Sequence, residues 1–477
     1  MNRALRRVAV AALVMFAALL VNANIVQVVD AKSLRDNPHN VRLLYAEYSR
    51  QRGPIVVGRS SVARSVPTND ALKYLRIYPS GPVYAPVTGW YSLTYQYSGI
   101  EQAENDILSG DSDLLFARHL SDVFTGRKPQ GGAVVLTLDP KVQQAAYAAL
   151  GGRRGAVVAL DPRTGAILAM VSSPSYDPSR ISTHNQTANV RAWNAYMRDP
   201  DQPMLNRAIS QTYPPGSTFK VVTTAAALSS GRYTPSTEIP APNALSFNDS
   251  NRKLHNFQGE TCSGGGRMTL ADALRVSCNT AYGALGIALG SSALQSQAQA
   301  FGIGHSLTIP LHVATSRFVA EQGQALTADS AIGQASDAVT PLQMAMVAAG
   351  VANGGVVMKP YLVAQERAPD SSVVGQAHPQ ELGRAISPSV AAELTSMMER
   401  VVTNGTGTAA QIPGVTVAGK TGTAENVPGR PTHAWFICFA PAQDPQVAVA
   451  VVVENGGTGG VTSAPIARRV LSAALSR

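Results

Sequence analysis

Three short motifs in the chain combine residue types that can carry out nucleophilic catalysis. In the first, QTYPPGSTFKVVTTAAALSSG, Ser217 and Lys220 are three residues apart, so on a helix their side chains share one face. A serine hydroxyl becomes a nucleophile when a neighbouring base takes its proton, and an amine with a lowered pKa can be that base. The ordinary alternative is a helix-capping serine beside a solvent-facing lysine, so this motif alone is a weak signal.

The second motif is Ser277-Cys278-Asn279, within MTLADALRVSCNTAYGAL. Thr269 and Asp272 fit a capping box that opens a helix, which predicts that the motif lies near a helix break. There a hydroxyl can relay a proton, and an amide can hold a substrate carbonyl. Turn chemistry alone explains the same residues equally well.

The third motif, Lys420-Thr421-Gly422-Thr423, lies in GVTVAGKTGTAEN. An ammonium group and two hydroxyls suit a substrate carboxylate. The glycine permits close backbone approach by a ligand. The plainer alternative is a bulged edge strand.

The same segment also matches a phosphate-binding loop, G-x-x-x-x-G-K-T, starting at Gly414. Such a loop needs a buried strand before its first glycine and a helix from its lysine. Here a polar stretch ending in proline comes before, and Gly422, Pro428 and Pro431 disfavour a helix after Lys420. We therefore expect a strand leading into Lys420, and nucleotide binding is disfavoured.

Local patterns predict the elements that must position these motifs. A helix is expected from about Ser217 to Gly231, and helices dominate 217–350. Asp139-Pro140 predicts another helix start. The apolar segments GAVVALDPRTGAILAMVSS, HAWFICFAPA and QVAVAVVVEN predict a hairpin and two further paired strands, and SAPIARRVLSAALS predicts a terminal helix. An antiparallel sheet made from both ends of this region, with helices between, indicates an α+β fold.

The chain of 477 residues is too long for one ordinary core, so two or three domains are expected. The part before about residue 130 has a different texture. YAEYSRQRGPIVVGRS and YPSGPVYAPVTGWYSLTYQYSG predict short strands and turns, and GIEQAENDILSG predicts a short helix closed by Gly110. No catalytic constellation occurs there. The expected division is 1–30 as a membrane segment, 31–132 as a small β-rich accessory domain and 133–477 as the catalytic domain.

The N-terminus predicts a membrane anchor. Arg3, Arg6 and Arg7 precede an uncharged, largely apolar run that reaches Val29, and about 20 apolar residues cross a bilayer. Arginines stay on the cytoplasmic side, which places the rest of the chain outside. The alternative is a cleaved signal peptide, since VNA at 21–23 resembles a processing site. We expect a retained single-pass anchor in the cell membrane.

Composition restricts the partners. Apolar residues make up 45% and charged residues 14%, so most of the chain should fold. The net charge of +9 comes mostly from scattered arginines without interleaved aromatics, so nucleic-acid binding is not expected. A basic surface facing anionic lipid or wall polymer is favoured instead.

The three cysteines give no metal-binding pattern, and no H-E-x-x-H occurs, so no metal or other cofactor is expected. In an oxidising compartment Cys262 and Cys278 can pair, which would constrain the unfolded chain by roughly 3 kcal/mol. Three reduced buried thiols, Cys438 included, are an equally good interpretation.

Together, in this order and with gaps of about 60 and 140 residues, the three motifs resemble those of class B penicillin-binding proteins, the membrane-anchored D,D-transpeptidases of peptidoglycan synthesis. The resemblance is nearest to the actinobacterial members. Further similar blocks are LDPRTGAILAMVSSPSYDP, NRAISQTYPPGSTFK, the AIGQ…VTPLQMAMVAAGVANGG run and KTGTAEN…HAWFICFAP. The resemblance covers 133–477 well and 31–132 loosely, chiefly through QRGPI and YSGIEQAENDILSG. One departure is Cys278, which would leave the chemistry intact if its side chain points away.

The resemblance implies a role for each motif residue. Ser217 attacks the carbonyl of the penultimate D-Ala of a stem peptide and expels the terminal D-Ala. Lys220 takes the serine proton, Ser277 helps to pass a proton to the leaving amine, and Asn279 orients the substrate amide. An amine of a second stem peptide then attacks the acyl-enzyme. β-Lactams imitate D-Ala-D-Ala and stall at the acyl stage.

The third motif is implied to bind substrate. Lys420, Thr421 and Thr423 would hold the D-Ala carboxylate beside Gly422. The backbone N–H groups of Ser217 and Thr423 would form the oxyanion hole, in which each donor is worth about 3 kcal/mol.

Other functions on the same fold are a D,D-carboxypeptidase, a β-lactamase and a non-catalytic β-lactam sensor. No E-x-x-L-N element for water activation occurs, and the intact Ser217, Lys220 and Lys420 argue against an inactive scaffold. The expected partners are peptidoglycan stem peptides, β-lactam antibiotics and the cytoplasmic membrane. No glycosyltransferase block precedes the catalytic domain, so the resemblance implies a membrane glycosyltransferase of the shape, elongation, division and sporulation family as a further partner.

Overall fold

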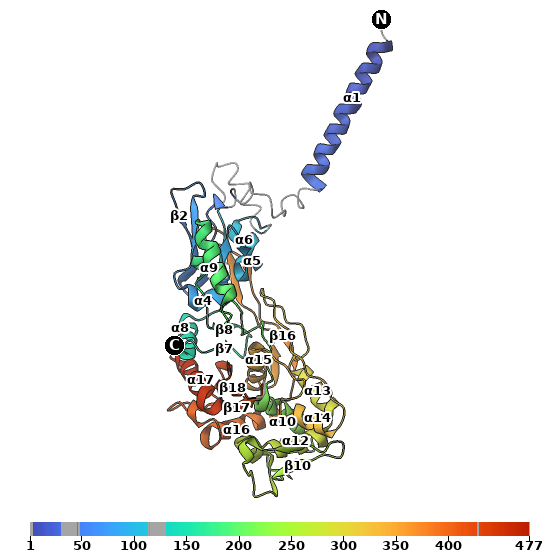
Figure 1. Ribbon diagram of the computed structural model, residues 1–477, viewed down its shortest axis with the longest axis vertical. Coiled ribbons are helices and arrows are strands. Elements are labelled where there is room, and N and C mark those ends of the chain that lie inside the picture. Colours follow the sequence, from blue (N-terminus) through green and yellow to red (C-terminus); the bar gives the residue numbers. More distant parts are fainter. Residues whose placement is uncertain are drawn as a thin grey trace.

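The computed structural model describes residues 3–29, 45, 48–112, 114, 130–426 and 429–476. The first element is helix α1 (Arg3–Asn24), continued by a π-helical turn (Ile25–Val29). Within the described residues, Leu5–Val29 is helical, long and apolar enough to cross a membrane, and its most apolar part buries no residue against the protein. Figure 1 shows this helix at one end of the molecule.

A six-stranded sheet forms the core of the accessory region, in the order β15-β14-β6-β1-β2-β3. Its strands are β1 (Ile55–Val57), β2 (Ser60–Pro67), β3 (Tyr74–Ile77), β6 (Ala133–Leu136), β14 (Val363–Arg367) and β15 (Val373–Gln376). β1 and β6 are parallel, and the other pairs are antiparallel. Strands from both sides of residue 132 thus share one sheet, and the boundary drawn there stays a prediction.

Helix α4 (Gly81–Thr88) corrects one expectation, because YPSGPVYAPVTG was predicted to form strands and turns. Pro86 lies inside this helix, where its ring nitrogen cannot donate a hydrogen bond. Side chains of the catalytic region donate to three of its carbonyl groups: Gln143 to Val83 at 2.8 Å, Tyr176 to Ala85 at 3.2 Å, and Asn206 to Pro86 at 2.7 Å. These tertiary bonds stabilise a helix that the local composition does not favour.

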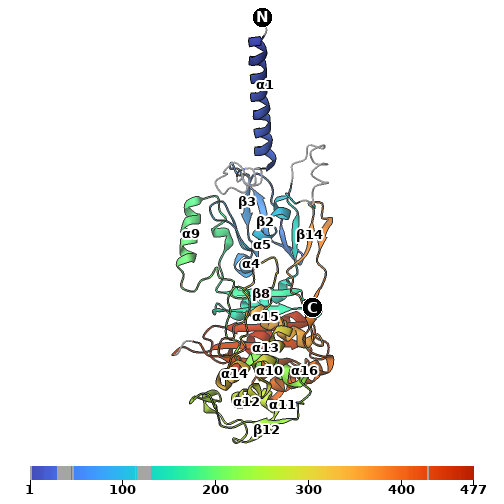
Figure 2. The ribbon, with the colours of Figure 1, turned by 90° about the vertical axis from the view of Figure 1, so that its right-hand side faces the viewer.

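The rest of the accessory region is mostly short elements. The predicted helix over GIEQAENDILSG is split at Glu104 into α5 (Gly99–Ala103) and α6 (Asn105–Ser109), and Gly110 closes it in the left-handed conformation. β4 (Tyr91–Ser92) pairs with β5 (Gln96–Tyr97). Figure 2 shows α9 (Gln186–Arg198) alongside the accessory region near α4.

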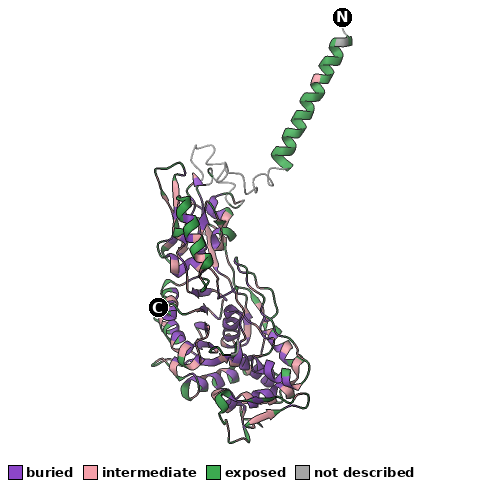
Figure 3. Ribbon diagram, in the orientation of Figure 1, coloured by how far each residue is buried: buried purple, intermediate pink, exposed green. Residues whose placement is uncertain are grey.

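A five-stranded antiparallel sheet in the order β17-β18-β19-β7-β8 forms the centre of the catalytic region. Its strands are β7 (Gly155–Leu160), β8 (Ile167–Ser173), β17 (Ala418–Ala424), β18 (His433–Ala440) and β19 (Val447–Val453). Every residue of these strands except Thr423 is buried, because helices cover both faces. Figure 3 shows this buried centre. The predicted hairpin and paired strands are confirmed.

One face of this sheet packs on α8 (Pro140–Leu150) and α17 (Gly459–Leu475). The other face packs on α15 (Pro341–Ala352) and α16 (Pro388–Asn404), and α10 (Lys220–Ser229) packs on α16 within the same apolar core. Asp139 caps α8 as expected, since its carboxylate accepts from Lys141 N and Val142 N. The terminal helix begins at Gly459, a few residues before the predicted start.

Smaller elements complete the far end of the catalytic region. The helices there are α11 (Leu270–Val276), α12 (Asn279–Leu289), α13 (Ser291–Ala300) and α14 (Gln324–Ala331). The paired strands are β9 (Glu238–Pro240) with β12 (Arg267–Thr269), β10 (Ala244–Ser246) with β11 (Lys253–His255), and β13 (Val356–Met358) with β16 (Glu381–Arg384). Single 3₁₀ turns occur at Pro178–Arg180, Gly216–Phe219, Phe257–Gly259 and Thr408–Ala410.

Candidate active site

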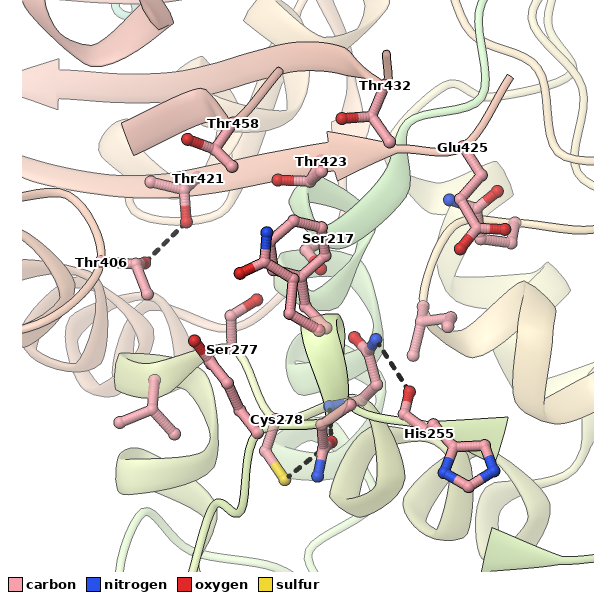
Figure 4. Close-up of a pocket in the computed structure, with 18 of the residues that line it drawn as sticks. Ser217, His255, Ser277, Cys278, Thr406, Thr421, Thr423, Glu425, Thr432 and Thr458 are labelled. Atoms are coloured by element: carbon pink, nitrogen blue, oxygen red, sulfur yellow. Dashed lines mark hydrogen bonds between the residues drawn. The ribbon is translucent and has the colours of Figure 1, made fainter. Parts of the chain in front are cut away.

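The three sequence motifs meet at one cleft of about 1130 Å³. Ser217, Ser277, Asn279, Thr421 and Thr423 line it. Figure 4 shows Ser217 between the threonines of β17 and the Ser277 turn. The side chains of the two motif lysines are fully buried behind this wall.

Ser217 lies in the 3₁₀ turn Gly216–Phe219, which leads directly into α10. The helix predicted for this segment is therefore confirmed, with a tighter first turn. Gly216 has a φ of 53°, and a Cβ atom there would come within 2.8 Å of the Thr423 carbonyl oxygen. Only glycine combines that conformation with such close packing on β17. Ser217 is half-buried, and its hydroxyl makes no hydrogen bond to the described part of the chain.

Lys220 reaches the second motif. Its Nζ donates to the Ser277 carbonyl oxygen at 2.7 Å, to Asn279 Oδ1 at 2.7 Å and to Ser277 Oγ at 3.3 Å. The Tyr282 ring lies 5.4 Å from the ammonium nitrogen. The amine nitrogen thus has three oxygen atoms within hydrogen-bond distance.

The Ser277 turn is a break between two helices, as predicted. Thr269 caps α11 by accepting from Asp272 N at 3.1 Å. Ser277 ends that helix with a φ of 63°, and α12 begins at Asn279. The side chain of Cys278 does not cap α12; Asn256 Oδ1 accepts from Asn279 N at 2.9 Å instead. Asn256 was missed in the sequence because it precedes the motif by more than twenty residues.

The structure decides between the two open interpretations of the cysteines. Cys278 forms a disulfide with Cys262, and both residues are part of the cleft wall. Cys438 is a free thiol buried in β18. The Cys278 side chain is only 1% exposed. Its disulfide links the Ser277 turn to the loop that carries Cys262, so the cysteine in the middle of the second motif has a structural role.

Lys420 lies in the middle of β17, so no helix follows it and the phosphate-loop alternative is wrong. Its Nζ donates to Ser277 Oγ at 2.8 Å and to the Thr421 carbonyl oxygen at 2.8 Å. The hydroxyl that both lysines contact is therefore that of Ser277. Thr406, which the sequence did not single out, also lines the cleft and exchanges a 2.6 Å hydrogen bond with the Thr421 hydroxyl.

Gly422 is packed closely against the protein itself. A Cβ atom at this position would come within 2.8 Å of Trp435 Cβ, 2.9 Å of Thr218 Cγ2 and 3.2 Å of the Pro215 carbonyl oxygen. The glycine therefore permits a close approach by the serine turn, and the expected approach by a ligand stays a prediction. Gly422 thus allows the first and third motifs to meet.

Burial sets the protonation of the two lysines. It lowers the pKa of Lys420 from 10.5 to about 7. Burial also lowers the pKa of Lys220 well below its ordinary value, and the charge on Lys420 lowers it further. Neither lysine forms an ion pair with any described residue, nor do three or more described His, Cys, Asp or Glu residues gather where they could hold a metal ion. A neutral amine beside a serine can act as a general base.

Comparison with known families gives two matches. Residues 155–472 match the model described as penicillin binding protein transpeptidase domain. Residues 52–134 match the model described as penicillin binding protein A dimerisation domain. The two matched segments cover most of the catalytic and accessory regions.

Individual relatives are similar over the whole chain. The peptidoglycan D,D-transpeptidase PbpA of Mycolicibacterium smegmatis is 49% identical, over 100% of this chain and 99% of the relative. PbpA of Mycobacterium tuberculosis is 46% identical over the same shares. Among solved structures, the ceftriaxone acyl-enzyme of penicillin-binding protein A from M. tuberculosis has a TM-score of 0.88 at 46% identity, covering 90% of this chain and 100% of that one. A D,D-transpeptidase domain from Eggerthella lenta has a TM-score of 0.80 at 36% identity, covering 90% and 99%.

Proposed function

The chain belongs to the class B penicillin-binding protein transpeptidases, and we propose that it crosslinks peptidoglycan as a D,D-transpeptidase through an acyl-enzyme on Ser217. The observation that carries the proposal is the meeting of Lys220 and Lys420 on the Ser277 hydroxyl, in the cleft that Ser217 lines. Relatives at 46% to 49% identity are named peptidoglycan D,D-transpeptidases, and the M. tuberculosis relative forms acyl-enzymes with β-lactams.

In the acylation step, Ser217 Oγ attacks the carbonyl carbon of the penultimate D-Ala, and its proton passes to the neutral amine of Lys220. This assignment draws support from the burial that lowers the pKa of Lys220 and so favours its neutral form. The N–H groups of Ser217 and Thr423 stabilise the oxyanion. When the tetrahedral intermediate collapses, the C–N bond breaks, and the leaving D-Ala amine receives a proton through Ser277.

Substrate binding falls to the other wall of the cleft. The protonated form of Lys420, with Thr421 and Thr423, holds the terminal carboxylate of the donor peptide. Asn279 orients the substrate amide, and its own side chain is already fixed by the bond from Lys220. Gly422 admits the serine turn beside this strand.

The acyl-enzyme is then released by an amine of a second stem peptide, which forms the crosslink and restores the Ser217 hydroxyl. Water as the acceptor would give the alternative D,D-carboxypeptidase activity. The names of the relatives favour the amine acceptor. A β-lactam enters the same acylation step and stays bound, because no leaving group departs from the site.

We further propose that α1 is a retained single-pass anchor with the catalytic region outside the cytoplasm. Arg3, Arg6 and Arg7 at its start support that orientation. The transpeptidase would then work beside a membrane glycosyltransferase of the shape, elongation, division and sporulation family, which supplies glycan strands. Protease digestion of right-side-out vesicles tests this orientation. We expect the catalytic region to be digested in intact vesicles. Digestion only after the vesicles are opened would contradict the proposed orientation.

The central test is labelling of the full-length protein, in detergent, with a fluorescent penicillin. We expect that wild type is labelled and that Ser217→Ala abolishes labelling. Ser210→Ala is the matched control, because that serine lies seven residues upstream and is exposed outside the active-site cleft. Labelling of Ser217→Ala at the wild-type rate would contradict the proposed nucleophile.

A second measurement separates transfer from hydrolysis. Two stem peptides are incubated with the enzyme, and the products are separated by mass. We expect a crosslinked dimer together with free D-Ala. Release of D-Ala without any dimer would favour the carboxypeptidase alternative.

A further inference from the structure

A partly buried carboxylate next to the active site accepts three hydrogen bonds. Glu454 directly follows β19, and its Oε1 accepts from Arg207 Nε at 2.8 Å and from the Tyr213 hydroxyl at 2.8 Å. Its Oε2 accepts from Arg154 Nε at 2.9 Å. Arg207 is fully buried, and Tyr213 is 3% exposed. Burial would raise the pKa of Glu454, but the Tyr213 hydroxyl and the Arg207 guanidinium hold it below its ordinary value, so the group stays ionised.

Residues 213–217 form a short segment, here called the serine arm, that begins at Tyr213 and ends at the proposed nucleophile Ser217. The two residues after Tyr213 are Pro214 and Pro215, which have no N–H group to donate. The arm is therefore held from its sides. Tyr213 exchanges two backbone hydrogen bonds of 2.9 Å with Val339, and Trp435 Nε1 donates to the Pro214 carbonyl oxygen at 3.1 Å. The hydrogen bond from the Tyr213 hydroxyl to Glu454 fixes the start of this arm through a side chain.

Glu454 belongs to the sheet that carries the other wall of the cleft. In the register of that sheet, Val453 lies opposite Ala434, and Ala434 lies opposite Thr423. Glu454 directly follows Val453, so it lies one residue beyond the cross-strand row that contains Thr423. Its bond to Tyr213 links the end of β19, the central strand of the sheet, to the serine arm.

The serine arm and β17, which form the two walls of the cleft, are packed closely against each other. A Cβ atom on Gly216 would come within 2.8 Å of the Thr423 carbonyl oxygen. Gly216 N donates to the Gly333 carbonyl oxygen at 2.8 Å, which fixes the arm from behind. A small shift of the arm therefore changes the distance between the backbone N–H groups of Ser217 and Thr423.

We propose that Tyr213 and Glu454 are positioning residues that set the separation of the Ser217 and Thr423 N–H groups, and thereby the geometry of the oxyanion hole. This inference rests on the proposed function, because it concerns the acylation step on Ser217. The two residues act on catalysis through the serine arm and do not touch the substrate. Losing the Tyr213 hydroxyl should slow acylation more than it weakens substrate binding.

The accessory region contains a matched control. There Glu101 accepts from Arg52 Nε at 2.7 Å, from Arg76 Nε at 2.6 Å and from the Tyr78 hydroxyl at 3.1 Å. Like the cluster around Glu454, it consists of one glutamate, two arginines and one tyrosine. All its members are buried, whereas the Arg154 side chain of the other cluster is 38% exposed. It lies among β1, β3 and α5, which carry none of the three motifs.

The experiment compares Tyr213→Phe with Tyr78→Phe in the full-length protein. Acylation by a fluorescent penicillin is followed by stopped flow over a range of concentrations, which separates the dissociation constant from the acylation rate constant. For Tyr213→Phe we expect a fall of about tenfold in the rate constant, since small misplacements of reacting groups cost up to about a hundredfold. The dissociation constant should stay within about twofold of wild type. Tyr78→Phe should lower the melting temperature to a similar extent and leave the rate constant unchanged.

Glu454→Asp gives an independent measurement if Tyr213→Phe does not fold. It keeps the negative charge for the two arginines but withdraws the carboxylate from Tyr213, and we expect it to slow acylation where Glu101→Asp does not. An unchanged rate constant in both cleft variants, or an equal slowing in the accessory variants, would overturn the inference. Failure of the proposed function looks different, because wild type itself would then not be acylated on Ser217.

Discussion

The accessory region and the active-site cleft both bury cationic side chains. In the accessory region Arg52 and Arg76 are at most 4% exposed, and the Glu101 carboxylate accepts hydrogen bonds from both. In the cleft Lys220 and Lys420 are fully buried, and among the described residues they donate to hydroxyl, amide and carbonyl oxygens without an ion pair. The two regions therefore differ in whether the buried charge has a counter-charge.

The difference decides what the buried groups can do. Burial alone would raise the pKa of Glu101, but Arg76 and Arg52 hold it below its ordinary value, so the accessory cluster keeps its charges and serves structure. In the cleft no carboxylate of the described residues offsets desolvation, so the pKa values of Lys220 and Lys420 fall. A lysine that loses its proton near neutral pH is a base, so the missing counter-charge makes chemistry possible at a cost in stability.

The largest expected effect comes from removing the proposed base. Lys220→Met should slow acylation by about 10²- to 10⁴-fold, the usual share of a general base. It should leave the melting temperature unchanged or raise it, because methionine fills similar space without a charge to desolvate. Penicillin labelling and thermal unfolding measure the two quantities. Lys359→Met, at an exposed lysine, is the control. An acylation rate of Lys220→Met within tenfold of wild type would contradict the role of Lys220 as the base.

The second prediction uses the pH dependence of stability. Lys420 has a pKa of about 7 in the folded protein and 10.5 when unperturbed, so between these values the unfolded chain binds more protons. The free energy of unfolding of wild type should therefore rise with pH across this window relative to Lys420→Met, by on the order of 5 kcal/mol in total. Glu101 acts in another window, since its lowered pKa removes stability only as the pH falls into the acid range.

Urea unfolding at pH 7, 8.5 and 10 measures this difference for wild type and Lys420→Met. Lys359→Met again serves as the control, because an exposed lysine should give no such slope. The prediction would be contradicted if the difference in free energy of unfolding between wild type and Lys420→Met were the same at all three pH values. The buried Lys420 would then have a compensating interaction in the folded protein.

The third prediction breaks the paired cluster. Glu101→Gln leaves two buried guanidinium groups without a carboxylate and should destabilise the protein by about 3 to 5 kcal/mol. The acylation rate constant of the folded fraction should match that of wild type, because the cluster contacts none of the motifs. Urea unfolding and stopped-flow acylation test both halves, with the exposed Glu393→Gln as control. If Glu101→Gln were as stable as wild type, the ion pairs of Glu101 with Arg52 and Arg76 would not be what distinguishes the accessory cluster from the cleft.

The smallest effect concerns the hydroxyls beside Lys420. Thr406→Val removes the 2.6 Å hydrogen bond with Thr421, and a typical net bond is worth about 0.5 to 1.5 kcal/mol. We expect a severalfold rise in KM for a donor peptide with a free terminal carboxylate and little change in kcat. Thr406→Ser, which keeps the hydroxyl, should restore the wild-type value. A fall in kcat at constant KM would show that Thr406 acts on the lysines instead of on carboxylate binding.

Local sequence signals predicted much of the fold around the site. Asp139 and Thr269 cap the helices that they were expected to cap, and the Ser277 turn breaks a helix where predicted. These features depend on hydrogen bonds within a few residues, so the sequence alone contains them. Helix α4 was predicted wrongly, because its carbonyl groups are satisfied by side chains from the catalytic region.

The same division applies to the candidate site. Asn256, which caps α12, and Thr406, which pairs with Thr421, gave no local signal, because each acts on a motif through a contact that only the folded chain creates. For Gly422, the sequence predicted a close approach by a ligand, and this stays a prediction. The structure adds a close approach by the Pro215–Thr218 turn, for which no local signal exists.

The sequence by itself determined the order and types of the three motifs, the strands and helices that carry them and the apolar N-terminal helix, because residue type and spacing encode these features directly. Only the tertiary structure decided that both lysines meet on Ser277 and that neither contacts a carboxylate of the described residues. The physical reason is that burial and the absence of a counter-charge are properties of the space around a side chain. That space is built from segments that are far apart in the chain.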